Sequence, residues 1–294
     1  MTKLDFIKYS PGGNPTILVT WPKLSGQARA AVAAELMHPQ HLTAEQVGFI
    51  DLKAAPPRLD MMGGEFCLNA TRCLVYEMWR EGLFFPLAGT DDYFGLAQSS
   101  GLETPAQVRV KNARNTGKDK PVECFVQLDV KPDIAELDKG ALLVRLPGIS
   151  HLLLDERYHD LPEYPMVAAR ERLGRYGLLE EEACGVIWHR VEPIAEKDLI
   201  ACRITPIIHV AATKSCVAET SCGSGTLALA LAMTPKMDFG QGMAIMRVIQ
   251  PSGEAIKLRI APLETKAGYR IELGGSVRMV ARGETFVAAA AKES

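Results

Sequence analysis

The sequence predicts an α+β fold made of two similar α/β domains, each with a central helix. Short strand-like runs alternate with helix-like runs along the 294 residues. A pattern of cysteine, any residue, small polar, small and threonine occurs at residues 67–71 and again at 222–226. An apolar helix-like run follows each copy at once. Because the copies lie about half a chain apart, a duplicated unit explains both.

In the first half, strands are predicted for short β-branched or alternating runs, and helices for alanine-rich or one-sided apolar runs. The strands are residues 16–20, 46–51, 108–110 and 124–130, and the helices are residues 26–37 and 71–82. Residues 10–14, rich in glycine and proline, form a turn before the first strand.

The second half repeats this alternation. Its predicted strands are residues 142–146, 185–189, 207–211, 244–250, 255–260, 269–273 and 277–281, and its helices are residues 166–178 and a run starting near Gly225. Lys131, Pro132 and Asp133 suit a linker. The predicted domains are therefore residues 1–130 and 131–294, with the last strand able to return to the first domain.

Charge and hydropathy limit the classes of partner. The formal net charge is −2, so there is no excess of positive charge to neutralise a nucleic-acid backbone. The longest apolar run, residues 226–233, is far shorter than the roughly 20 residues that span a bilayer. The first residues lack the apolar core of a signal peptide, and the 7 cysteines are scattered. We therefore expect a cytoplasmic protein with reduced thiols and neither a nucleic-acid nor a membrane partner.

Cys67 and Cys222 each precede a predicted helix. The N–H groups and the positive dipole end of a helix N-terminus stabilise anions, and thiol pKa values there fall from about 8.5 to roughly 3.5–7.5. The sequence thus predicts two thiols with lowered pKa. The same N–H groups can hold a substrate carboxylate.

Two such thiols suit inversion at a carbon next to a carboxylate. One removes a proton from one face of the carbon, and the other returns a proton to the opposite face. The backbone N–H groups of Leu68, Asn69, Gly223 and Ser224 would stabilise the charge that builds on the carboxylate. Because two thiolates at close range repel each other, the resting pair should hold one proton between them. This pattern favours a two-base amino-acid racemase.

The motifs also resemble a known family. Phe66-Cys-Leu-Asn-Ala-Thr-Arg-Cys73 and Ser221-Cys-Gly-Ser-Gly-Thr226 resemble the two cysteine motifs of diaminopimelate epimerases. They are more similar still to the histidine racemases of staphylopine-type opine metallophore biosynthesis. Three further segments match that family: residues 6–19, 45–50 and 250–253.

The resemblance implies a diaminopimelate epimerase-like fold with the active site in the cleft between the domains, no cofactor such as pyridoxal phosphate, and a homodimer. It also implies that Cys67 and Cys222 are the catalytic pair that interconverts L- and D-histidine. The substrate-binding residues that it implies are Asn14, Glu45, Gln46, Leu68, Asn69, Glu219, Gly223 and Ser224.

Two departures from the diaminopimelate epimerase pattern bear on the substrate. Leu68 replaces the glycine that usually follows the first cysteine and adds bulk beside the site. Residues 214–221 contain no arginine to hold a second carboxylate. Diaminopimelate therefore ranks below histidine as the substrate, while Leu68 keeps open an isomerase of the same fold that acts on another amino acid or a related acid.

A non-catalytic interpretation stays open at this point. Cys67 with Cys73, and Cys216 with Cys222, are spaced six residues apart and could mark a metal or redox module. These intervals miss the two to four residues usual between zinc ligands. We expect no metal, and we expect Cys73 and Cys216 to be structural.

Overall fold

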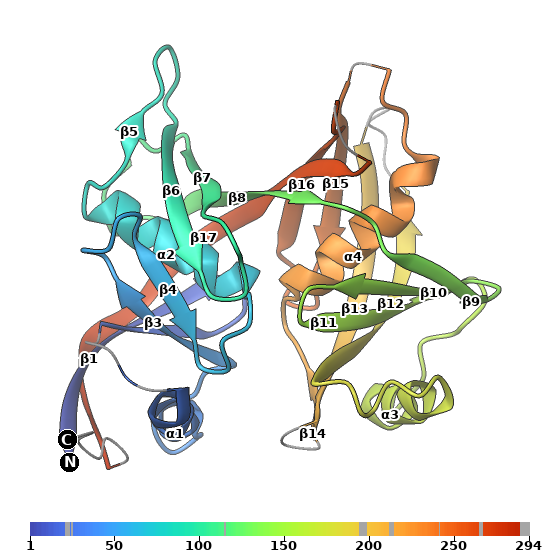
Figure 1. Cartoon of the computed structure of the whole chain (residues 1–294), viewed down its shortest axis with the longest axis horizontal. Helices are drawn as coiled ribbons and strands as arrows, with labels where there is room; N and C mark the ends of the chain where they lie inside the picture. Colours follow the sequence, from blue (N-terminus) through green and yellow to red (C-terminus); the bar gives the residue numbers. More distant parts are fainter. Residues whose placement is uncertain are drawn as a thin grey trace. The chain divides into compact units, whose positions relative to one another are not determined.

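The computed structural model describes residues 1–20, 24, 26–114, 116–193, 199–211, 215–240, 242–264 and 267–288. The chain forms two compact units, residues 1–127 with 274–294, and residues 128–273. The chain leaves the first unit within one strand, β8 (Val122–Val130), and returns within another, β17 (Tyr269–Val287). Figure 1 shows the elements of each unit.

The first unit is a ring of paired strands around a helix. Its remaining strands are β1 (Thr2–Pro11), β2 (Thr16–Thr20), β3 (Gln46–Asp51), β4 (Arg58–Met61), β5 (Phe85–Pro86), β6 (Tyr93–Ser99) and β7 (Ala106–Lys111). Pairing runs β1–β2–β3–β4–β6–β7–β8–β17 and closes from β17 back to β1. The pairs β2–β3 and β4–β6 are parallel.

Helix α2 (Leu68–Arg80) fills this ring and contacts β1, β2, β3, β4, β6 and β7. Residues 68–79 of the helix are all buried. The buried charges on α2 are paired: Arg72 donates to Ser276 O (2.8 Å), and Glu77 accepts from Tyr9 (2.5 Å) and Arg80 (2.8 Å). These bonds offset the desolvation of the charges and fix how α2 is oriented in the ring. The second helix, α1 (Gly26–Met37), packs against β3.

The second unit is a sheet with one helix on each face. Its strands are β9 (Ile134–Asp138), β10 (Ala141–Leu146), β11 (Ile149–Asp155), β12 (Ala183–Glu192), β13 (Leu199–Val210), β14 (Ser215–Ala218), β15 (Ala244–Ile249) and β16 (Ala255–Pro262). They pair in the order β9–β10–β11–β12–β13–β15–β16, with β14 also on β13. The pairs β11–β12 and β13–β15 are parallel.

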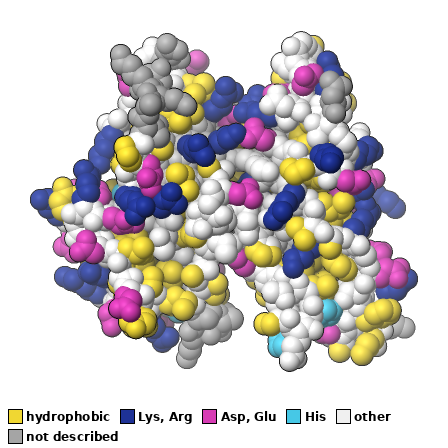
Figure 2. Space-filling view, turned by 180° about the vertical axis from the view of Figure 1, so that it is seen from behind, with side chains coloured by type: hydrophobic (Ala, Val, Ile, Leu, Met, Phe, Trp, Pro, Cys, Tyr) yellow, Lys and Arg dark blue, Asp and Glu magenta, His cyan; other side chains and the backbone are white. Residues whose placement is uncertain are grey.

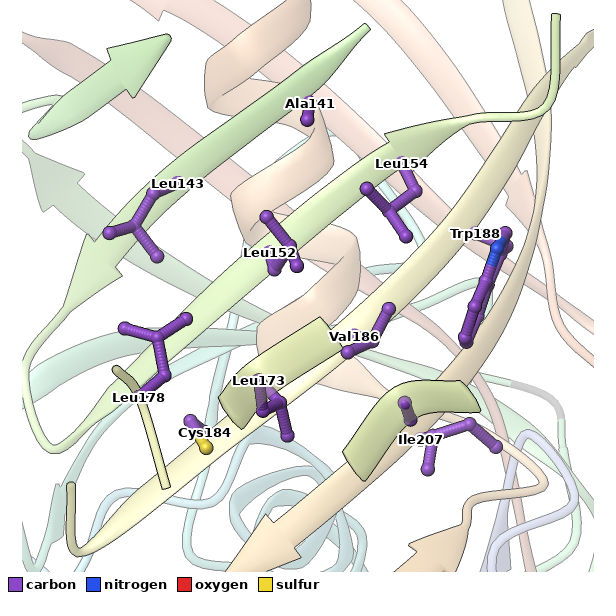
Figure 3. Packing of buried hydrophobic residues seen from close by; sticks show 11 residues of the cluster. Ala141, Leu143, Leu152, Leu154, Leu173, Leu178, Cys184, Val186, Trp188 and Ile207 are labelled. Atoms are coloured by element: carbon purple, nitrogen blue, oxygen red, sulfur yellow. The ribbon is translucent and has the colours of Figure 1, made fainter. Parts of the chain in front are cut away.

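Successive residues of β12 face opposite helices because side chains alternate along a strand. Trp188 lies in an apolar cluster with Leu152 and with Leu173 of α3 (Pro165–Arg175), as Figure 3 shows. Ile187 instead lies beneath α4 (Gly223–Met233), where a Cβ added to Gly225 would meet its side chain at 2.7 Å. Helix α4 is apolar on every side and continues into the 3-10 turn η2 (Thr234–Lys236).

Several predicted elements differ in extent. The helix predicted from residue 71 begins at Leu68, and the one predicted for 166–178 is Pro165–Arg175. The two final strands, predicted at 269–273 and 277–281, are one continuous strand, β17. Strands β1, β4, β5, β6, β9, β11 and β14 were not predicted. Of these, β4, β5 and β14 are too short to show a period of two.

Surface charge agrees with the near-zero net charge. On the face seen in Figure 2, lysine and arginine side chains are interspersed with aspartate and glutamate over each unit. No helix within the described residues is long and apolar enough to cross a membrane.

His151 on β11 makes the stability of the fold depend on pH. The side chain is fully buried, and in the described part of the chain neither ring nitrogen has a hydrogen-bond partner. Burial lowers the pKa of His151 from 6.5 to about 3. Between these values the unfolded chain binds a proton that the native state does not bind. Stability is therefore highest above pH 6.5 and is lost as the pH falls.

We expect His151→Leu to remove the part of the pH dependence that comes from His151. Well below pH 6.5 the native protein should lose about 1.4 kcal/mol of unfolding free energy per pH unit through this residue, and the variant should lose that much less. Urea denaturation at pH 7, 6 and 5 measures the slope. Leu153→Ala, on the same strand face, is the control and should weaken the fold by a similar amount at every pH. An unchanged slope in His151→Leu would contradict the assignment.

Candidate active site

Cys67 is the N-cap residue of α2. Its backbone is extended (φ −124°, ψ 111°), and its Sγ accepts a hydrogen bond from the Ala70 N–H at 3.4 Å. The Thr71 hydroxyl donates to the Cys67 carbonyl at 2.7 Å. The thiol is partly exposed. The helix N-terminus predicted beside this cysteine is present.

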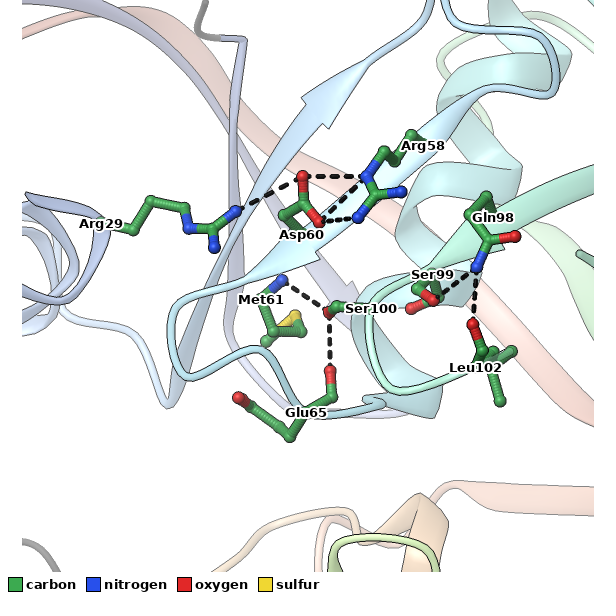
Figure 4. A network of polar contacts seen from close by, with 9 residues as sticks. All are labelled: Arg29, Arg58, Asp60, Met61, Glu65, Gln98, Ser99, Ser100 and Leu102. Atoms are coloured by element: carbon green, nitrogen blue, oxygen red, sulfur yellow. Dashed lines mark hydrogen bonds and ion pairs between the residues drawn. The ribbon is translucent and has the colours of Figure 1, made fainter. Parts of the chain in front are cut away.

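The loop that leads into Cys67 is fixed by Ser100, which lies just after β6. The Ser100 hydroxyl accepts from the Met61 N–H (2.9 Å) and donates to the Glu65 carbonyl (2.7 Å), as Figure 4 shows. The neighbouring Gly101 packs so closely on the loop that an added Cβ would lie 2.3 Å from the Phe66 nitrogen. The position of Cys67 thus depends on a turn more than 30 residues later in the chain.

A chain of polar side chains ends on the Cys67 thiol. The thiol donates to Gln46 Oε1 (2.6 Å), and Gln46 Nε2 donates to Asn14 Oδ1 (2.5 Å). Asn14 Nδ2 donates to the Glu45 carboxylate (2.5 Å), and Thr16 donates to Asn14 Oδ1 (2.9 Å). The structure therefore brings Asn14, Glu45 and Gln46 together with the first cysteine. Thr16, on β2, was not predicted.

Cys222 caps α4 in the same way. Its backbone has φ −116° and ψ 108°, and its Sγ accepts from the Gly225 N–H at 3.3 Å. The Thr226 hydroxyl donates to the Cys222 carbonyl at 2.7 Å, matching the Thr71 bond in the first unit. The Ser224 hydroxyl lies 3.6 Å from the sulfur. The two copies of the sequence pattern are thus two copies of one helix cap.

The pKa of Cys222 runs against the sequence-based expectation. Burial raises it well above the usual range, and the carboxylate of Glu219, which also hydrogen-bonds to the thiol, raises it further. The bonds from Ser224 and from the Gly225 N–H act in the lowering direction and are outweighed. The prediction of a lowered pKa was wrong here, because Cys222 is only 1% exposed and has an acidic neighbour. Cys222 holds its proton in this state.

The remaining predicted residues lie close to the two caps in sequence and space. Leu68 and Asn69 are buried in the first turn of α2, where Asn69 Oδ1 accepts from Arg72 at 3.3 Å. Gly223 and Ser224 form the first turn of α4. At a helix N-terminus, the first N–H groups have no acceptor within the helix and can face a bound anion.

Neither Cys73 nor Cys216 lies at the N-terminus of a helix. Cys73 is fully buried on α2, and burial raises its pKa well above the usual range. Cys216, on β14, lies 3.7 Å from His209 Nδ1, and burial raises its pKa too. Within the described ranges, no group of three or more histidine, cysteine, aspartate or glutamate side chains is arranged to hold a metal ion.

Several solved structures share the fold of this chain. A hydroxyproline epimerase from Agrobacterium vitis is 9% identical, with a TM-score of 0.62, and the match covers 96% of this chain and 92% of that one. A probable proline racemase from Agrobacterium radiobacter K84 is 11% identical, with a TM-score of 0.62 and coverage of 97% and 93%. A PhzF-family phenazine biosynthesis protein from Bacillus anthracis is 11% identical, with a TM-score of 0.61 and coverage of 98% and 100%. The chain has the fold of these racemases and epimerases.

Comparison of the sequence with known proteins shows the family to which this chain belongs. Residues 3–286 match the family described as the histidine racemase CntK N-terminal domain, and the chain belongs to that family. A histidine racemase of Fusobacterium nucleatum is 28% identical over 287 residues, covering 97% of each chain. One from Staphylococcus aureus is 25% identical over 295 residues, covering 97% of this chain and 98% of its own. The protein is an isomerase that acts as an amino-acid racemase.

Proposed function

We propose that this protein interconverts L- and D-histidine, with Cys67 and Cys222 as the acid/base pair. The observation that carries the proposal is the matched cap: each sulfur accepts from the N–H three residues later, at the mouth of a helix. Curated relatives along the whole chain are named histidine racemases. The product would supply an opine-type metallophore pathway.

The proposed reaction needs two proton transfers. One sulfur, as thiolate, takes the proton from the α-carbon, and the electron pair of the C–H bond moves into the carboxylate as an enediolate. The opposite thiol then gives its proton to the other face of the carbon. Burial and Glu219 raise the pKa of Cys222, and the Cys67 thiol donates to Gln46 Oε1, so one of the two thiols loses its proton before the first transfer. The mechanism requires both sulfurs to reach one α-carbon from opposite sides.

The backbone lowers the energy of the enediolate. First-turn N–H groups, such as those of Asn69 and Ser224, can donate to the substrate carboxylate as its negative charge grows. The helix dipoles act in the same direction. In this mechanism the helix N-termini, and no cofactor, stabilise the negative charge of the enediolate.

Polar side chains near Cys67 would bind the rest of the substrate. Gln46 orients the thiol through its bond to Sγ, and Asn14 fixes the direction of the Gln46 amide. The Glu45 carboxylate, held by Asn14, can accept from the imidazole N–H or the ammonium group of histidine. Glu219 offers a second carboxylate beside Cys222.

A panel of amino acids tests the substrate. Purified protein is incubated separately with L-histidine, L-lysine, L-glutamine, L-proline and LL-diaminopimelate, and each product is analysed by chiral chromatography. Histidine should give a kcat/KM at least about tenfold above any other member, since a site that hydrogen-bonds a side chain rejects those that lack its groups. A higher kcat/KM for another amino acid would reject histidine as the substrate while leaving the two-thiol mechanism standing.

A further inference from the structure

In the second unit, the buried side-chain amide of Gln250 is hydrogen-bonded to the backbone of Cys222. The Cys222 N–H donates to Gln250 Oε1 at 2.9 Å. Gln250 Nε2 donates to Thr226 Oγ1 at 3.0 Å, and the same Thr226 hydroxyl donates to the Cys222 carbonyl at 2.7 Å. These three bonds form a closed cycle that begins and ends on the cysteine and passes through one glutamine and one threonine.

The orientation of this amide is fixed by its partners. Gln250 Nε2 also donates to the Val248 carbonyl at 3.1 Å. Rotating the amide by 180° would put its NH₂ group against the Cys222 N–H and its oxygen against the Val248 carbonyl, so both contacts would be lost. Gln250 and Thr226 are both fully buried, so water cannot replace a missing bond.

The turn that contains Gln250 is itself tied to the segment before the cysteine. The Ser252 N–H donates to the Thr220 carbonyl at 3.0 Å, and the Gly253 N–H donates to the Gln250 carbonyl at 2.9 Å. The turn after β15 and residues 220–222 therefore form one hydrogen-bonded piece. Gln250 lies at its centre and connects it to the first turn of α4.

The first unit holds its cysteine differently. There a glutamine, Gln46, contacts the Cys67 sulfur itself. In the second unit, Gln250 bonds to the Cys222 backbone and to the Thr226 hydroxyl. The two glutamines thus act on different parts of the two cysteines.

We propose that Gln250 is a positioning residue for Cys222, which places the sulfur by holding the N–H of the cysteine directly and its carbonyl through Thr226. The inference rests on the proposed function, in which Cys222 transfers a proton. Gln250 does not touch the reacting atoms. Without these hydrogen bonds, Cys222 could shift and its Sγ would move away from the α-carbon of the substrate. A displacement of about 1 Å can slow a proton transfer roughly 10- to 100-fold.

The test uses Gln250→Met, which keeps the length of the side chain and removes its hydrogen bonds. Thr234→Val is the matched control, because it removes one buried hydrogen bond at the other end of α4, from Thr234 Oγ1 to the Leu231 carbonyl. Racemisation is measured from both enantiomers of histidine, each with hydrogen or deuterium on the α-carbon, at equal folded protein concentration by circular dichroism.

We expect Gln250→Met to lower kcat/KM roughly 10- to 100-fold, and Thr234→Val to lower it less than threefold. The α-deuterium isotope effect should rise for the enantiomer that Cys222 deprotonates and should fall for the other, since the Cys222 step becomes the slow one for both. A purely structural role would leave the two isotope effects changed alike.

Three results are informative. Unequal isotope effects in Gln250→Met support the assignment. Equal effects, or a loss no larger than that of Thr234→Val, overturn it while the wild-type activity stands. No racemisation by the wild-type protein would instead reject the proposed function, and with it the role of Cys222 on which this inference rests.

Discussion

Replacing either Cys67 or Cys222 by serine should lower histidine racemisation at least about 1000-fold, because a serine hydroxyl is a far weaker acid than a thiol and cannot serve as the base near neutral pH. In each variant the serine oxygen can accept the helix-cap hydrogen bond in place of the sulfur, so the fold should be retained. Chiral chromatography of the product, with circular dichroism as the check on folding, measures both quantities.

Cys73→Ala provides the matched control for the thiol chemistry. Cys73 lies on the same helix as Cys67 and is fully buried, so its loss removes a thiol and a little core volume without touching the cap. It should keep racemisation within about threefold of the wild-type rate, since the loss of a buried core thiol acts mainly on stability. If Cys67→Ser or Cys222→Ser racemises as fast as Cys73→Ala, the two-thiol mechanism is wrong.

Gly101→Ala should lower the free energy of unfolding by at least about 3 kcal/mol, the range of substitutions that force a backbone to move. Gly101 has a left-handed backbone (φ +74°), and an added Cβ would lie 2.3 Å from the Phe66 nitrogen and 2.9 Å from the Glu65 carbonyl carbon. Relief of this overlap would displace the loop before Cys67, so activity should fall as well. Urea denaturation gives the free energy.

Gly89→Ala distinguishes the cost of steric overlap from the cost of placing an alanine in a left-handed backbone conformation. Gly89 has nearly the same φ, +77°, but an added Cβ would have nothing within 4 Å. Gly89→Ala should lower the free energy of unfolding only by the cost of a left-handed alanine, roughly 1–2 kcal/mol. Equal losses in the two variants would show that the close approach of Gly101 to the Cys67 loop contributes nothing to stability.

The two helix caps could be predicted because their signal is local. A cysteine followed by small residues, threonine and an apolar run carries the cap and the helix within about a dozen positions. The same holds for Asn14, Glu45 and Gln46, which entered through a resemblance spread over short segments. Their grouping around Cys67 is visible only in the structure, because it joins the segment before β2, the start of β3 and the N-cap of α2.

Other features depend on contacts distant in sequence. Gly274 and Gly275 suggest a break between two strands, yet β17 continues through them. Glycine is needed at 274 because an added Cβ would lie 2.1 Å from the Cys124 carbonyl oxygen. The roles of Ser100 and Gln250 likewise come from partners 35 and 28 residues away. The raised pKa of Cys222 could not be predicted because burial is a property of the whole fold.

The most direct test of the two-thiol claim is the distribution of deuterium when the wild-type protein converts L-histidine in D₂O. Early in the reaction, D-histidine should carry deuterium on its α-carbon while the recovered L-histidine keeps hydrogen, because the proton is removed on one face by one sulfur and replaced on the other face by a second, solvent-equilibrated sulfur. Deuterium entering both enantiomers at the same early rate would indicate a single base and would contradict the account.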